Sequence, residues 1–173
     1  FLKENVIGGY TINCVGDERQ YSCMFSKNEN SPSDEALIEA YKLLKIKNYK
    51  VYSFLKDRGA DERQYNSPGI DLNITSIFRS KFNDYPEYHT SLDNFDLVTL
   101  KGCLGGFNVA KKSIEVLLER KYPKYKILCE PQMGKRGLYP TLSTINSYKL
   151  GNTYLDFLQY ADGKNSLEKI AKL

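Results

Sequence analysis

The sequence lacks the features that mark several common classes of protein. No apolar run approaches the roughly 18 residues that a membrane-spanning helix needs, and the start FLKENVIGGY lacks the basic region and long apolar stretch of a signal peptide. We therefore expect a cytoplasmic chain with no membrane partner. The four cysteines have no C-x-x-C spacing, which excludes a zinc ribbon and a thioredoxin-like motif and favours reduced, mostly buried thiols.

Several catalytic signatures are missing as well. The chain has no G-x-S-x-G motif for a serine hydrolase, no P-loop and no G-x-G-x-x-G. It has a single histidine, His89. A lone histidine is usually structural, so its surroundings decide whether it has a chemical role.

Composition favours an ordinary folded protein. Hydrophobic residues make up 41% of the 173 residues and charged residues 27%, which fits one domain, or one domain with a small appendage. Of the 25 Lys and Arg and 21 Asp and Glu, residues 119–173 hold 10 and 5, a net of +5, while residues 1–118 have a net of −1. A solvated surface is the default explanation of this basic excess, and nucleic-acid binding is the alternative.

Hydrophobic periodicity and turn residues predict a series of strands and helices before Pro123. Ser31-Pro32-Ser33-Asp34 is typical of a helix start, with a serine N-cap and proline in the first turn. The expected elements are a strand at 10–15, a helix from Ser31 to near Lys47, strands at 49–55 and 70–78, an irregular stretch at 79–90 and a helix from Thr99. This order predicts the α/β class and fits part of an αβα sandwich.

The character of the chain changes after Pro123. A short strand at 125–129, a basic loop at 130–140, a helix at 153–161 and a last helix capped by Ser166 are expected. Two short helices joined by a tight turn resemble the opening of a winged-helix module. We therefore divide the chain into domains at 1–122 and 123–173. A helical appendage that packs on its own enzyme domain would give the same pattern.

The run DERQY occurs twice, at 17–21 and at 61–65, and His89 follows the second copy. Both copies follow predicted strand ends, so we expect both at the same edge of the sheet, where α/β proteins bind ligands. Glu87, Tyr88 and Asp93 surround the histidine, and imidazole is the commonest protein ligand of metals.

The segments GADERQYNSPGIDL and RSKFNDYPEYHTSLDNF resemble the zinc-dependent aminopeptidases of the bacterial leucyl-aminopeptidase and glutaminyl-cyclase type. The resemblance is closer to a bacterial aminopeptidase-like subfamily, often found near polysaccharide-biosynthesis genes, with YHTSLD and CEPQ-x-GKRGLYPT segments and a C-terminal winged-helix region. It covers nearly all of the chain. It implies a mixed-sheet αβα aminopeptidase-like sandwich, followed by a small winged-helix-like module.

The resemblance assigns roles to individual residues. It implies His89 as a zinc ligand, and Asp61 as the acid beside the metal, with Glu62 next to it where the superfamily often has histidine. The usual zinc-binding aspartate of the first strand is replaced here by Asn13 or Cys14. Asp17 is then either a metal-site acid or part of a coincidental loop. Arg63, Glu87 and Tyr88 are candidates for substrate binding, with an internal salt bridge as the alternative for the charged members.

The implied chemistry is hydrolysis of a peptide or amide bond beside a free amino terminus by water bound to zinc. Its substrates would be peptides or small aminoacyl compounds. The chain starts without methionine, and we expect it to be a fragment whose other metal ligands and general base lie before residue 1. The rival hypothesis is a degenerate scaffold that acts as a binding protein, possibly on nucleic acid through its basic C-terminal module.

Overall fold

The computed structural model describes residues 2–138 and 145–173. The chain divides into two compact units, Phe1–Leu118 and Glu119–Leu173, and each is described by itself. Within the described residues, no helix is long and apolar enough to cross a membrane.

The first unit is built on a mixed sheet of four short strands. The strands are β1 (Gly9–Ile12), β2 (Ser22–Met24), β3 (Lys50–Tyr52) and β4 (Ile74–Phe78), in the spatial order β1-β4-β2-β3. β1 is parallel to β4, and β2 is parallel to β3, but β2 and β4 are antiparallel. β1 and β3 therefore run in opposite directions. The ends of β1 and β3 thus lie at opposite edges of the sheet. The expectation that both DERQY copies lie at the same edge is therefore wrong.

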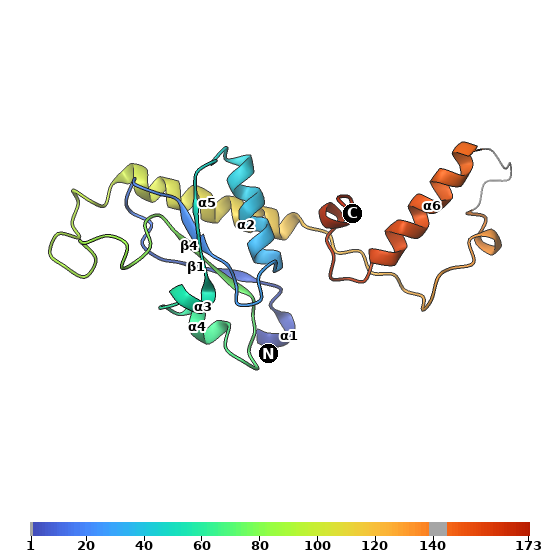
Figure 1. The fold of residues 1–173 in the computed structure, drawn as a ribbon, viewed down its shortest axis with the longest axis horizontal. Helices are drawn as coiled ribbons and strands as arrows, with labels where there is room; N and C mark the ends of the chain where they lie inside the picture. Colours follow the sequence, from blue (N-terminus) through green and yellow to red (C-terminus); the bar gives the residue numbers. More distant parts are fainter. Residues whose placement is uncertain (1, 139–144) are drawn as a thin grey trace. The chain divides into compact units, whose positions relative to one another are not determined.

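Each face of the sheet has its own hydrophobic cluster, because successive side chains of a strand point to opposite faces. Cys23 and Ile77 belong to a cluster with residues of α2 (Pro32–Leu43) and α5 (Leu100–Glu119). Met24 and Phe78 belong to another cluster, which Phe54 of α3 (Phe54–Asp57) joins. Figure 1 shows α2 and α5 on one side of the sheet and α3 and α4 (Glu62–Tyr65) on the other, as in an αβα sandwich.

The predicted start of the first long helix is confirmed by its capping contacts. The Ser31 hydroxyl accepts a hydrogen bond from the backbone N–H of Asp34, and the Asp34 carboxylate accepts one from the backbone N–H of Ser31. Asp34 is buried and also accepts hydrogen bonds from the Ser26 backbone and hydroxyl and from the Thr75 hydroxyl. The helix thereby becomes anchored to the loop after β2 and to the central strand β4.

The helix expected from Thr99 is present as α5, but its apolar stripe faces outward. The large apolar side chains of the stripe are exposed: Leu100, Leu104, Phe107, Ile114 and Leu118. The buried face is made mostly of small residues, because the helix backbone approaches the loop after β1. A Cβ atom at Gly102 would lie 1.9 Å from the carbonyl oxygen of Gly16.

Several local predictions differ from the structure. The strand expected at 49–55 is shorter, since β3 ends at Tyr52 and α3 follows at once. Helix α4 and strand β2 were not predicted. The irregular stretch at 79–90 is confirmed, as it contains no helix or strand.

The second unit contains a 3₁₀ turn (Gly134–Arg136), α6 (Ile145–Tyr160) and α7 (Leu167–Ile170). In place of the strand expected at 125–129 there is an isolated bridge between Lys124 and Asp162. The Ser166 hydroxyl accepts a hydrogen bond from the backbone N–H of Lys169, which confirms it as an N-cap. The expected basic loop at 130–140 extends beyond the described residues at its end.

Candidate functional site

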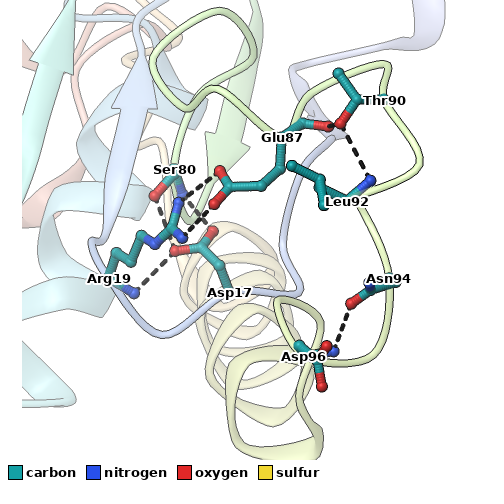
Figure 2. Close-up of polar contacts among 8 residues, drawn as sticks. All are labelled: Asp17, Arg19, Ser80, Glu87, Thr90, Leu92, Asn94 and Asp96. Carbon is teal, nitrogen blue, oxygen red and sulfur yellow. Dashed lines mark hydrogen bonds and ion pairs between the residues drawn. The ribbon is translucent and has the colours of Figure 1, made fainter.

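Asp17 joins the loop after β1 to the loop after β4. It is 6% exposed, and its carboxylate accepts hydrogen bonds of 2.8 Å from the backbone N–H of Arg19 and from the backbone N–H and hydroxyl of Ser80. Its carbonyl oxygen accepts a hydrogen bond from Nε of Arg79, whose guanidinium lies over the Tyr21 ring. Figure 2 shows the carboxylate held between the two loops. Asp17 therefore has a positioning role in the folded chain.

Arg19 and Glu87 form a bidentate ion pair that joins the same two loops. The guanidinium nitrogens Nη1 and Nη2 donate to the two carboxylate oxygens at 3.0 and 2.8 Å (Figure 2). This hydrogen bonding from Arg19 lowers the pKa of Glu87 to about 2 and raises the pKa of Arg19. Glu87 is therefore ionised at neutral pH, and an amine that binds to it must share or displace Arg19.

His89 lies on the exposed part of the β4–α5 loop. Its backbone is left-handed, with φ of 59°, and its ring stacks on that of Tyr88 with centroids 3.9 Å apart. Tyr88 is half-buried and packs against Phe82 and Tyr85, with ring centroids about 6 Å apart in each pair. The imidazole is thus presented to solvent on an aromatic support that belongs to one of the two hydrophobic clusters.

Short-range hydrogen bonds shape the loop beyond His89. The hydroxyl of Thr90 donates to the carbonyl oxygen of Glu87 at 2.8 Å and accepts from the backbone N–H of Leu92 at 3.2 Å. The side chain of Asn94 accepts from the backbone N–H of Asp96 at 2.8 Å (Figure 2). These turns leave the residues from 89 to 96 exposed.

Asn13 and Cys14 lie just after β1. The backbone N–H of Asn13 donates to the carbonyl oxygen of Ile77 at 3.1 Å, which extends the pairing of β1 with β4. Cys14 is half-buried with φ of 50°. Burial raises the pKa of Tyr85, and a hydrogen bond with the Cys14 side chain raises it further. Cys14 therefore contacts the loop that carries Glu87 and His89, whereas Asn13 extends the sheet.

The second DERQY copy contains both exposed and buried residues. Asp61 is exposed, whereas Glu62 is fully buried. Oε1 of Glu62 accepts hydrogen bonds from the backbone N–H groups of Gly59 and Ala60 at 2.7 and 3.0 Å, and Oε2 has no partner among the described residues. Glu62 therefore holds its own loop in place, while Asp61 presents its carboxylate to solvent.

The described residues do not form a complete zinc site. They contain no group of three or more His, Cys, Asp or Glu side chains arranged to hold a metal ion. Both carboxylate oxygens of Asp17 already accept hydrogen bonds, and His89 offers a single imidazole. Zinc binding remains a prediction, and the structure supplies no geometry for it.

Arg19 and Ser80 were not among the predicted site residues, although Arg19 connects Asp17 to Glu87 and Ser80 binds Asp17. The available signal was the repeat itself, because the first copy places an arginine two residues after its aspartate. The structure thus brings Asp17 and Glu87 together through Arg19, with Tyr88 and His89 on the adjoining part of the β4–α5 loop. Arg63 lines a separate groove with Arg58.

Comparisons with known proteins define the class of the chain. The family model described as "winged helix-turn-helix" matches residues 120–173. The protein is thus a mixed α/β domain followed by a C-terminal winged-helix domain.

The model described as "Domain of unknown function (DUF4910)" matches residues 2–120, and the chain belongs to this family. A protein of Clostridium acetobutylicum named "Putative polysaccharide biosynthesis protein with aminopeptidase-like domain" is 32% identical over 97% of the chain. A crystal structure titled as that of a putative peptidase from the same organism is 30% identical over 98% of the chain, with a TM-score of 0.65. The chain spans 38% of the curated relative and 37% of the crystallised chain.

Proposed function

We propose that the protein is an aminopeptidase-like hydrolase that cleaves a peptide or amide bond beside a free amino terminus. The observation that carries this proposal is the similarity, at 30 and 32% identity over nearly the whole chain, to two proteins with peptidase-type names. Because each relative is more than twice as long, the proposal concerns the activity of the whole protein. This chain would contribute loops to its site.

Within this proposal, the residues of the chain have different tasks. Asp61 transfers protons, because its carboxylate is exposed, and a carboxyl group is a common general acid or base. Glu62 positions Asp61 by binding the backbone of the preceding turn. Glu87 recognises the substrate's amino group by sharing its carboxylate between that group and Arg19. Tyr88 supports the ring of His89.

Binding of zinc is a separate prediction. If it binds, His89 supplies one donor, and the metal would supply a water of lowered pKa. Calorimetric titration of this 173-residue chain with zinc should detect no tight site, because the described residues lack a three-donor cluster. Nanomolar binding that His89→Ala abolishes would show that the chain holds a complete site after all.

The enzymatic test is hydrolysis of aminoacyl anilides by the protein at its full native length. Asp61→Asn should lower kcat about a hundredfold or more with a smaller change in KM, as is typical when a general acid or base is lost. Asp96→Asn, an exposed aspartate of the β4–α5 loop, is the matched control and should leave turnover unchanged. Absence of turnover, or equal turnover in Asp61→Asn, would contradict the proposal. A chelator tests the zinc prediction independently.

The rival hypothesis, a degenerate scaffold that binds nucleic acid, has less support because both relatives carry peptidase-type names. Inactive, metal-free protein that retards DNA in a gel at low salt would favour it.

A further inference from the structure

A groove with a volume of about 440 Å³ lies on the first unit. Its lining residues do not include Arg19 or Glu87. Residues of α3 and α4 line it, together with Lys27 from the loop after β2 and residues directly after each of the two helices. None of the described residues that line it is acidic. Its lining instead brings together two arginines, Arg58 and Arg63, with apolar side chains.

Both arginines are held by backbone contacts that, among the described residues, occupy only some of their donors. Nη1 of Arg58 donates to the carbonyl oxygens of Phe54 and Leu55, and its guanidinium lies 5.7 Å from the centre of the Phe54 ring. Nε of Arg63 donates to the carbonyl oxygen of Ala60 at 3.2 Å. A guanidinium has five N–H donors, so these bonds occupy only part of each group. Among the ion pairs of residues 2–138 and 145–173, none includes either arginine.

The third cation of the groove, Lys27, differs from the two arginines because it forms an ion pair with Asp71. The hydrogen bond from Lys27 lowers the pKa of Asp71, so the carboxylate is ionised at neutral pH. Their charges offset one another. The uncompensated positive charge of the groove therefore comes from Arg58 and Arg63.

One wall of the groove is fixed to the sheet by Asn66, which is 2% exposed. Its Nδ2 donates to the carbonyl oxygen of Ile74 at 2.8 Å, and its Oδ1 accepts from the backbone N–H of Ile74 at 2.9 Å. This paired contact attaches the end of α4 to the first residue of β4. A wall held in this way needs little ordering when a ligand binds, which favours affinity.

We propose that this groove binds a small carboxylate that carries a short apolar body. Arginine is suited to this chemistry because its planar donors match the two oxygens of a carboxylate. The side chains of Phe54, Leu55 and Pro68 give the apolar body a surface to contact. The inference goes beyond the proposed hydrolase, since binding in the groove requires no turnover.

The test is a titration of the 173-residue chain with N-acetyl-L-leucine, followed by amide NMR shifts and calorimetry. Shifts should concentrate in residues 54–68. Arg58→Gln and Arg63→Gln should each weaken binding about tenfold, as expected for loss of a charge-assisted hydrogen bond. Lys56→Gln, which removes an exposed cation of α3 that does not line the groove, is the control and should bind as the unaltered chain does. N-acetyl-L-leucinamide, which lacks the carboxylate, should bind at least about tenfold more weakly.

Three results of the N-acetyl-L-leucine titrations would overturn the proposal, and a phosphate titration gives a fourth test. These are equal binding of the amide, arginine variants that bind as well as Lys56→Gln, and shifts that fall outside the groove. Inorganic phosphate that binds as tightly as N-acetyl-L-leucine would also overturn it, since the site would then recognise charge alone. Because both arginines are exposed, circular dichroism and thermal unfolding should show that the variants remain folded.

Discussion

Replacing Asp17 by asparagine tests whether this residue holds the two loops of the candidate site together. The carboxylate accepts hydrogen bonds from the backbone of Arg19 and from the backbone and hydroxyl of Ser80 in a site that is 6% exposed. An asparagine of the same shape keeps one oxygen but turns an NH₂ group toward a donor. At least one donor is then left without an acceptor inside the protein.

The expected cost follows from these contacts. A hydrogen bond to a charged group contributes about 1.5–3 kcal/mol, and a buried donor without a partner costs about 1–3 kcal/mol. Since the contacts share one carboxylate, they do not add, and Asp17→Asn should lower the free energy of unfolding by about 2–4 kcal/mol. Asp96→Asn, whose side chain is exposed, should change it by less than about 0.5 kcal/mol.

Urea unfolding followed by circular dichroism measures this difference. Because the chain has two compact units, amide exchange of β4 should accompany it, so that the loss is assigned to the first unit. A cost below about 1 kcal/mol would refute the positioning role of Asp17. If Asp17→Asn instead left stability intact and weakened binding of zinc, a metal-site role would replace it.

Two further predictions concern ionisable groups. The pKa of Glu87 is about 2 in the folded chain against an ordinary 4.5, so its pairing with Arg19 stabilises the fold fully above about pH 4.5 and stops doing so as the pH falls through 2. The difference in urea midpoint between the unaltered chain and Glu87→Gln should therefore shrink from pH 5 to pH 2, and a constant difference would contradict the ion pair. Burial raises the pKa of Cys23 to about 12, so its thiol should resist alkylation at pH 8 while the exposed Cys103 reacts. Mass spectrometry of the alkylated chain measures both sites, and equal labelling in the folded chain would show that Cys23 is accessible.

The two helix starts capped by Ser31 and Ser166 were the most predictable part of the fold, because capping is a local property. Ser31 and Asp34 bond to each other within one turn, and Ser166 does the same for α7. The position of α5 was also predictable, but the face that it buries was not. Contact with Gly16 requires a small residue at Gly102, so the close approach of two backbones overrides the pattern of large apolar residues.

The candidate site was less predictable, because it depends on long-range pairing. Strand β2 has three residues, too few to show a period, yet it separates β3 from β4 and reverses the direction between the two halves of the sheet. The partners of Glu87 and Asp17 likewise come from loops that are far apart in the sequence. The zinc ligands, the catalytic residues and the substrate remain predictions.

The packing at Gly102 connects helix α5 to the Arg19–Glu87 ion pair. A methyl group there would collide with the carbonyl oxygen of Gly16, the residue directly before Asp17. The peptide would have to move, and Arg19 would be carried with it from its place opposite Glu87. A replacement on the buried face of α5 would thus disturb an ion pair with which it makes no contact. This one glycine is therefore a remote determinant of loop geometry.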